Sequence, residues 1–376
     1  MTTELCDKLF AIIRAGMDLV CAPLDLSETD CKELMQIGAR QSIFPIIHRG
    51  LKNSCASKGI VKESDRLCLK DTKQYILQSD ALSKISAALD GEQIPYIPLK
   101  GAVLRHLYPT PELRTSSDID VLVRMEDLEK AVAAIEKATD FKTLKKAYHD
   151  ISMVNSSVHL ELHFTLKENS ENIDRLLSQA WEYAKPAGDG SSRYVFSPEF
   201  LVFHVIAHMN HHFLHGGLGI RPFLDLWLLK NKTEYDEIVV RAMCSECGIL
   251  KFYEESCNLA EVWLGSGVHT ETTKLLEDFC LSGGVFGSAK FMNAGRQREK
   301  RGWKYILSRA FPPAYQVKEY YSDAEGREHT LMYYYGKRLL SWGVRRAELK
   351  KQMKIVLSSD TEYLNTADEL FRRLEL

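Results

Sequence analysis

Residues 114–123, RTSSDIDVLV, place two aspartates at the start of a β-branched, apolar run. Side chains at positions i and i+2 of a strand point to the same face, so Asp118 and Asp120 are expected to lie side by side. Two carboxylates on one face repel each other and lose hydration, and a divalent cation, often Mg²⁺, relieves both costs. The stretch therefore predicts a strand with a metal site at its start.

A second strand pattern follows in residues 156–164, SSVHLELHF. Apolar residues alternate there with His159, Glu161 and His163, so one face of the strand can be buried while the other is polar. Glu161 is the candidate for the third carboxylate of the metal site.

The composition is that of a soluble globular protein. The chain has 376 residues, of which 45% are hydrophobic and 27% are charged. This length predicts two or three domains with a sizeable core. The formal net charge of −2 gives no overall attraction for nucleic acid or an anionic membrane, so neither is the expected partner.

The cysteines and the apolar runs indicate in which cellular compartment the protein is expected and whether it crosses a membrane. Nine cysteines follow no repeating spacing, and the start, MTTELCDKLF, does not resemble a signal peptide, so a reduced, cytoplasmic protein is expected. Cys244 and Cys247 form a CxxC with no second pair, and they are expected to be buried helix cysteines. Residues 200–229 are apolar but contain histidines, an Arg and an Asp, which predicts packed helices and no membrane span.

The sequence changes its period on either side of the two strands. Apolar residues recur at helical spacing up to about residue 89. Residues 94–101, IPYIPLKG, are typical of a short strand that Gly101 closes, and a brief helix and a proline-containing loop follow. Residues 125–138 predict an amphipathic helix, and helical spacing returns after the connector at 185–200.

Two further strands are expected at residues 141–154, FKTLKKAYHDISMV, and at 156–164. A turn at Asn155–Ser156–Ser157 separates them, and this turn predicts that the pair are antiparallel neighbours of the carboxylate strand. The result would be a small mixed sheet between helices.

Three motifs in order carry a family resemblance: Leu99–Lys100–Gly101, then RTSSDID at 114–120, then ELH at 161–163. This order resembles the polymerase-beta-like nucleotidyltransferase superfamily. The likeness is closest to the bacterial uncharacterised nucleotidyltransferase family, with its LKG, R-x-x-x-DID and V-x-L-E-x-H, and it extends to GIRPFLDL at 219–226.

The resemblance implies an α+β fold. Its nucleotidyltransferase domain, with a small mixed sheet, is expected at residues 90–190. An N-terminal helical region at 1–89 and a helical C-terminal domain at 191–376 would flank it. The site is expected in the cleft between the sheet and the helical domain.

The resemblance also implies an activity, which is transfer of a nucleoside monophosphate from a nucleoside triphosphate to a hydroxyl-bearing acceptor. Two Mg²⁺ ions, or Mn²⁺, would be held by Asp118, Asp120 and Glu161. Asp120 would bridge the ions, and Glu161 would also take up the acceptor proton. A small molecule, a protein side chain and an RNA end all stay open as the acceptor.

Phosphate contacts are implied for Lys100, Gly101, Arg114 and Ser117, with Ser116 as a further candidate. Many superfamily members have a second Gly or a Ser after the motif glycine, where this chain has Ala102, so a hydroxyl contact is missing. Lys100 and the backbone N–H groups after Gly101 are expected to compensate. Gly101 itself is expected to supply a turn of positive φ and a close approach to phosphate.

Two other functions stay open. The missing hydroxyl after Gly101 favours a nucleotide-sensing or interaction module that has lost efficient chemistry. A histidine-based metallohydrolase is the other alternative, since five histidines share one expected helix, and His204/His208 and His208/His212 have the i, i+4 spacing that can put two imidazoles on one metal. The five are His204, His208, His211, His212 and His215.

Simpler interpretations apply to several of these residues. No HExxH glutamate accompanies the histidines, so positions along the seam between the sheet and the helical domain are favoured. Arg221 and Asp225 are four apart, which is typical of an exposed intrahelical pair worth only ~0.3–0.5 kcal/mol. The C-terminal aromatic residues more often build a core than a base-stacking wall, and they are left out of the site. They include Trp303, Tyr305, Phe311, Tyr315, Tyr320 and Tyr321.

Overall fold

The structure is a computed structural model that describes residues 2–19, 24–54, 57–147, 149–285, 287–296, 330–344 and 361–376. The chain begins with four helices, which are α1 (Thr3–Gly16), α2 (Glu28–Arg40), α3 (Phe44–Asn53) and α4 (Lys58–Gly91). Side-chain caps start three of them: Thr2 accepts from the N–H of Leu5, Ser27 forms a capping box with Asp30, and Ser57 accepts from the N–H of Ile60. The N-terminal part is therefore helical, as its spacing predicts.

A five-stranded mixed sheet follows, in the order β1-β2-β5-β4-β3. Its strands are β1 (Tyr96–Pro98), β2 (Asp118–Val123), β3 (Lys142–Lys146), β4 (Asp150–Val154) and β5 (His159–His163). The connections carry short helices, which are α5 (Lys100–Leu104), η1 (Arg105–Leu107), η2 (Pro111–Leu113), η3 (Met125–Asp127) and α6 (Leu128–Ala138). The expected small mixed sheet is thus confirmed.

One expectation about the sheet is wrong. Strands β4 and β5 form the expected antiparallel hairpin, but β5 runs parallel to the carboxylate strand β2. The chain leaves β2 through α6 and the strands β3 and β4, and it then enters β5 from the same end as β2. The stretch expected as one strand at 141–154 also divides into β3 and β4, which are antiparallel.

Helices dominate the rest of the described chain. They are α7 (Glu171–Leu177), α8 (Pro198–His215), α9 (Arg221–Lys232), α10 (Glu237–Glu246), α11 (Leu250–Leu264), α12 (Glu271–Ser282), α13 (Ala289–Arg296), α16 (Leu331–Val344) and α18 (Thr361–Arg373). The strands β6 (Ala184–Pro186) and β7 (Tyr194–Phe196) form a separate pair. The C-terminal aromatic residues at 303–321 lie outside the described residues.

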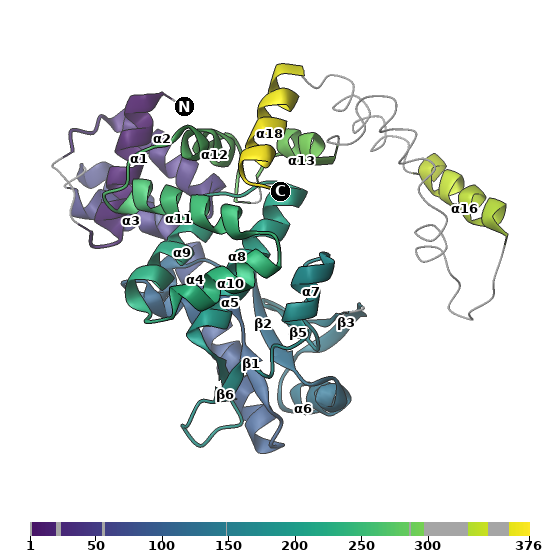
Figure 1. Ribbon diagram of the computed structural model, residues 1–376. Helices are drawn as coiled ribbons and strands as arrows, with labels where there is room; N and C mark the ends of the chain where they lie inside the picture. Colours follow the sequence, from purple (N-terminus) through teal and green to yellow (C-terminus); the bar gives the residue numbers. More distant parts are fainter. Residues whose placement is uncertain are drawn as a thin grey trace.

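Two hydrophobic cores organise these elements. The larger core joins α1, α2 and α3 to helices of the C-terminal half, and α1 packs on α11 (Figure 1). The smaller core lies between the sheet, α6 and the C-terminal half of α4. Segments on both sides of residues 89 and 190 share the larger core, and the domain boundaries at these residues stay a prediction.

The helices α8 and α9 lie above the sheet in the view of Figure 1. Ser197 caps α8 by accepting from the N–H of Phe200, and Pro198 occupies its first turn. Within the described chain, no helix has both the length and the apolar composition that a membrane crossing requires.

Candidate metal and nucleotide site

Strands β2 and β5 bring the acidic residues together. Asp118 lies opposite His159, and Asp120 lies opposite Glu161. Because side chains alternate between two faces along a strand, these four side chains share one face with His163. The intervening apolar residues belong to the smaller core, so a slip of one residue would bury the carboxylates and expose the core.

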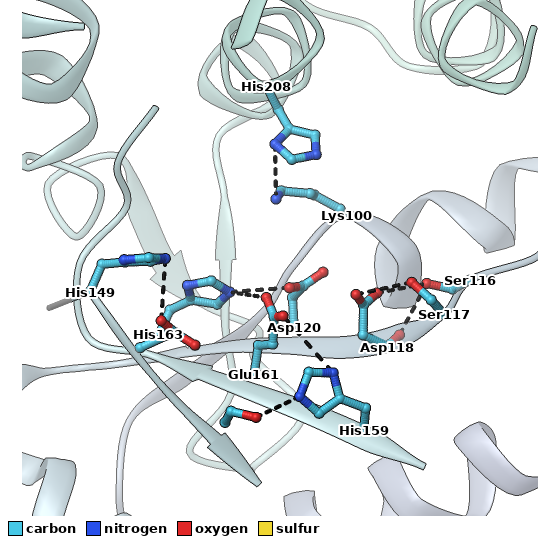
Figure 2. Close-up of polar contacts among 12 residues, drawn as sticks. Lys100, Ser116, Ser117, Asp118, Asp120, His149, His159, Glu161, His163 and His208 are labelled. Carbon is cyan, nitrogen blue, oxygen red and sulfur yellow. Dashed lines mark hydrogen bonds and ion pairs between the residues drawn. The ribbon is translucent and has the colours of Figure 1, made fainter. Parts of the chain in front are cut away.

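The polar face contains two overlapping sets of metal-ligating atoms. One set is Asp118, His159 and Glu161, and the other is Asp120, Glu161 and His163. Within each set these atoms lie within 4.8 Å of one another, and Figure 2 shows the side chains pointing toward a common space. Glu161 belongs to both sets, whereas Asp120, which is predicted to bridge two ions, belongs to one.

The donor set fits a divalent cation. Carboxylate oxygens are hard ligands that Mg²⁺ and Mn²⁺ prefer, and imidazole nitrogens suit transition-metal ions. Among the described residues, these two sets are the groups of His, Cys, Asp and Glu close enough to share an ion. The histidines of α8 form no such group.

Asp120 is the most buried of the three acids, with 8% of its surface exposed. Its Oδ1 lies 3.1 Å from Nε2 of His163. Burial opposes ionisation, but the charge of Lys100 and the hydrogen bond with His163 outweigh it and hold the pKa of this carboxyl well below its ordinary value. Asp120 is therefore ionised at neutral pH.

Glu161 behaves in the opposite way. Burial, together with the neighbouring charges of Asp120 and Asp118, raises the pKa of Glu161 above its ordinary value. A cation among the three acids would favour the ionised form.

The two serines before β2 hold Asp118 in place. The hydroxyl of Ser117 donates to Oδ2 of Asp118 at 3.1 Å, and that of Ser116 lies 3.3 Å from Oδ1 and 3.0 Å from the backbone oxygen of the same residue. Ser117, predicted as a phosphate contact, thus orients a carboxylate here.

The glycine motif differs in detail from its prediction. The left-handed backbone belongs to Lys100, whose φ is 30°, so the expectation of a positive φ at Gly101 is wrong. Gly101 is required by space, because a Cβ there would lie 2.9 Å from Oγ of Ser116 and 3.1 Å from Nη1 of Arg114. The close approach of Gly101 to phosphate stays a prediction, since the atoms that crowd this glycine here are those of side chains.

Arg114 forms a buried ion pair with Asp225. Nε and Nη2 of Arg114 donate to the two carboxylate oxygens of Asp225, each at 2.8 Å, and the hydroxyl of Tyr108 donates to Oδ1 at 2.8 Å. Arg114 is 7% exposed and Asp225 is 4% exposed. Nη1 of Arg221 donates instead to the backbone oxygen of Thr115 at 3.1 Å. The expected Arg221–Asp225 pair is therefore wrong, because Asp225 faces a buried guanidinium from another segment.

A cavity of about 270 Å³ lies over the carboxylates, between the sheet and helices α8 and α9. All seven predicted site residues line it, which are Lys100, Gly101, Arg114, Ser117, Asp118, Asp120 and Glu161. The helical wall adds His208, His212 and Arg221 and an apolar group of Val205, Met209, Leu218 and Pro222. The expected cleft between the sheet and the helices is present.

Helix α8 contacts the site through its histidines. Nδ1 of His208 lies 3.2 Å from Nζ of Lys100 and 2.9 Å from Oε1 of Glu168 (Figure 2 shows the first contact). Nε2 of His212 lies 2.9 Å from Nε2 of His208. His204 is 1% exposed, and burial lowers its pKa to about 3. His204, His208 and His212 thus lie at the boundary between the sheet and the helical part, as the sequence predicts.

Two further residues of the site have no predicted role. His163 has a signal in the sequence, because it follows Glu161 by two residues and must share its face. Glu168 has none, since it lies in a loop that reaches His208 and His211 only in the folded chain. Cys244, in α10, and Cys247, directly after this helix, are both buried, as expected.

A small mixed sheet with acidic residues at the wall of a cleft is the arrangement that the sequence resemblance predicts for a nucleotidyltransferase. A family model described as "Uncharacterised nucleotidyltransferase" matches residues 27–265, which is more than half of the chain, and the chain belongs to this family. The resemblance seen in the sequence is thereby confirmed. The chain is a transferase of nucleoside monophosphates, with a nucleoside triphosphate as substrate.

Two solved structures are similar at a distance. The crystal structure of ANT(2")-Ia in complex with adenylyl-2"-tobramycin shares 15% identity, covering 45% of this chain and 98% of that one, with a TM-score of 0.34. The solution structure of the antibiotic-resistance factor ANT(2'')-Ia shares 14% identity, covering 51% and 91%, with a TM-score of 0.28. No curated protein matches the chain.

Proposed function

We propose that this chain transfers a nucleoside monophosphate to a hydroxyl-bearing acceptor with two divalent cations, Mg²⁺ or Mn²⁺, as cofactors. Asp118, Asp120 and Glu161 are the ligands. The observation that carries the proposal is the convergence of these three carboxylates, from two parallel strands, on the wall of one cavity.

The cations would neutralise the charge of the triphosphate and polarise its α-phosphorus. Asp118 belongs to one ligand set and Asp120 to the other, whereas Glu161 belongs to both. We therefore assign the ligand that bridges the two cations to Glu161 in place of Asp120. Glu161 would also take up the proton of the acceptor hydroxyl.

Phosphate binding is assigned to the opposite wall of the cavity. Lys100 supplies a positive charge there, and Gly101 leaves room for the loop before β2 to close on it. Ser117 can donate to a phosphate oxygen when a cation takes over Asp118. Nη1 is the donor group of Arg114 that Asp225 does not hold, because Nε and Nη2 both donate to that carboxylate.

The test is the replacement Asp120→Asn, with pyrophosphate release measured from each nucleoside triphosphate in the presence of Mg²⁺ or Mn²⁺. Small hydroxyl compounds, proteins and short RNAs serve as acceptors. The variant should lose at least about 10³-fold in rate, because an amide does not neutralise a cation, while its circular dichroism stays unchanged.

Glu129→Gln, at an exposed position of α6, is the matched control and should keep wild-type transfer. Wild-type rates in Asp120→Asn would remove the assignment. Calorimetric titration with Mg²⁺-ATP and Mg²⁺-CTP tests the alternative that Ala102 favours. Binding by the wild type without any pyrophosphate release would identify a nucleotide-binding module.

A further inference from the structure

The third polar side chain of β5, His163, lies beside the buried Asp120 and the half-buried Glu161. Nε2 of His163 is 3.1 Å from Oδ1 of Asp120 and 3.6 Å from Oε2 of Glu161. Figure 2 shows the imidazole edge pointing at both carboxylates from the side opposite Asp118. One nitrogen atom thus faces two carboxylates at once.

The two distances from Nε2 suit a shared coordination sphere. Ligands bound at about 2.1 Å in tetrahedral or octahedral geometry are roughly 3.0–3.4 Å apart. The separation of Nε2 from Asp120 falls within this range, and that from Glu161 is close to it. A cation between them therefore requires only small movements of the side chains.

The surroundings hold His163 in this orientation. It is 7% exposed, its strand is hydrogen-bonded between β2 and β4, and the ring of His149 stacks on it with centroids 6.0 Å apart. A ligand whose rotamer is fixed before metal binding loses little entropy on coordination.

We propose that His163 is a direct metal ligand, through Nε2, of the cation that Asp120 and Glu161 hold. The site is then a mixed nitrogen–oxygen centre rather than one made of carboxylates alone. This inference rests on the proposed function, since it concerns one of the two cations assigned there.

The choice of metal follows from the nitrogen ligand. Mg²⁺ prefers an all-oxygen shell and retains its waters, whereas transition-metal ions bind imidazole readily. Mn²⁺ accepts carboxylate and imidazole together. We therefore expect a site that binds Mn²⁺ at least about tenfold more tightly than Mg²⁺ and that loses this preference without His163.

His159 is the internal comparison. It lies on the same face of β5, but its Nδ1 is 3.9 Å from Oε1 of Glu161 and its Nε2 is 2.7 Å from Oγ of Ser152. Its ring is thus partly held by a hydroxyl. His159→Gln and His163→Gln are a matched pair that removes one imidazole each from the same strand.

The experiment uses the full chain labelled with ¹⁵N-histidine and loaded with Mn²⁺ alone. Pulsed electron paramagnetic resonance measures coupling of the Mn²⁺ electron spin to ¹⁵N, and calorimetry measures affinities for Mn²⁺ and Mg²⁺. We expect ¹⁵N coupling in the wild type and in His159→Gln. His163→Gln should lose the coupling and the preference for Mn²⁺ while circular dichroism shows a folded chain.

Other outcomes overturn the assignment of His163. Coupling in His163→Gln that is as strong as in the wild type transfers the ligand role to another histidine. Mn²⁺ binding without ¹⁵N coupling in the wild type makes His163 a hydrogen-bond partner of the carboxylates, and the proposed function stands if Glu161→Gln weakens that binding. A wild type that neither binds Mn²⁺ nor releases pyrophosphate refutes the proposed function as well.

Discussion

At the scale of single residues, the site depends on close packing around Gly101, where the neighbouring side chains leave no room for a Cβ atom. Gly101 faces the hydroxyl of Ser116 and the guanidinium of Arg114, and both come from the loop that leads into β2. Ser116 in turn contacts Asp118. A larger residue at position 101 would therefore displace Ser116, and this shift would alter the position of Asp118, a carboxylate of the candidate metal site.

Replacing Gly101 with Ala should consequently impair the site more than the fold. The added Cβ would lie 2.9 Å from Oγ of Ser116, so the serine must shift and Asp118 loses a hydrogen-bond partner. We expect a loss of about 1–3 kcal/mol in the free energy of unfolding and a weaker affinity for Mn²⁺ with nucleotide. Urea denaturation and calorimetry measure the two effects.

Gly91→Ala is the control for this substitution. Gly91 is the last residue of α4, and a Cβ there would meet no atom within 4 Å. This variant should be as stable as the wild type or up to about 1 kcal/mol more stable, with unchanged affinity. Equal behaviour of the two variants would show that the contacts of Gly101 are irrelevant.

The sequence predicts the residues of this site better than their conformations. Lys100, Gly101 and the three acids are recognisable from motif order, but the positive φ at Lys100 and the pairing of Arg114 with Asp225 depend on distant segments. A motif fixes which side chains occur near the cavity. Their partners are decided by tertiary packing.

At the scale of elements, a buried ion pair joins the loop before β2 to helix α9. Asp225 accepts from Arg114 and Tyr108, and the three side chains come from different elements. Removing a charge from such a pair leaves its partner buried without compensation, which is far more costly than losing one neutral hydrogen bond. This contact fixes the loop of Ser116 and Ser117 against the helical wall.

Asp225→Asn and Tyr108→Phe should therefore differ strongly. Asp225→Asn leaves the guanidinium of Arg114 without a carboxylate and should lower the free energy of unfolding by about 3–5 kcal/mol. Tyr108→Phe removes one hydroxyl donor and should cost about 1–3 kcal/mol. Equilibrium urea denaturation distinguishes the two, and equal losses would show that the ion pair contributes nothing beyond a hydrogen bond.

The direction of the strands illustrates what periodicity does not contain. Alternation along residues 156–164 correctly predicts a strand with a polar face, because burial on one side sets a period of two. Whether that strand runs parallel to β2 depends on the path of the chain through α6, β3 and β4. The convergence of Glu161 with the aspartates needs only that the polar faces coincide.

At the scale of the whole molecule, the cleft exists because the helical part covers the polar face of the sheet. Helices α8 and α9 supply one wall, and the loop and strands before residue 165 supply the other. The helical periodicity of these segments predicts that they pack, but it does not predict the surface on which they pack. The contact of His208 with Lys100 is a product of this assembly.

The seam between these walls makes the stability of the whole protein depend on pH. Burial, with a contribution from Lys100, lowers the pKa of His204 to about 3 and that of His212 to about 4. In the unfolded chain both groups have ordinary pKa values near 6.5, so below that pH the unfolded state binds protons that the folded state does not. The contribution of these histidines to the free energy of unfolding is fully present above about pH 6.5, and it is lost as the pH falls below that value.

Between pH 6.5 and 5, each of these histidines should lower the free energy of unfolding by about 1.4 kcal/mol per pH unit. The decrease should end near pH 4 for His212 and near pH 3 for His204, where the folded groups also take up protons. His204→Leu removes one such group from the interior of α8. The dependence of its free energy of unfolding on pH should therefore be weaker by the contribution of one histidine, which is about 1.4 kcal/mol per pH unit. Urea denaturation at half-unit steps of pH measures both slopes, and identical slopes would mean that His204 ionises freely in the folded protein.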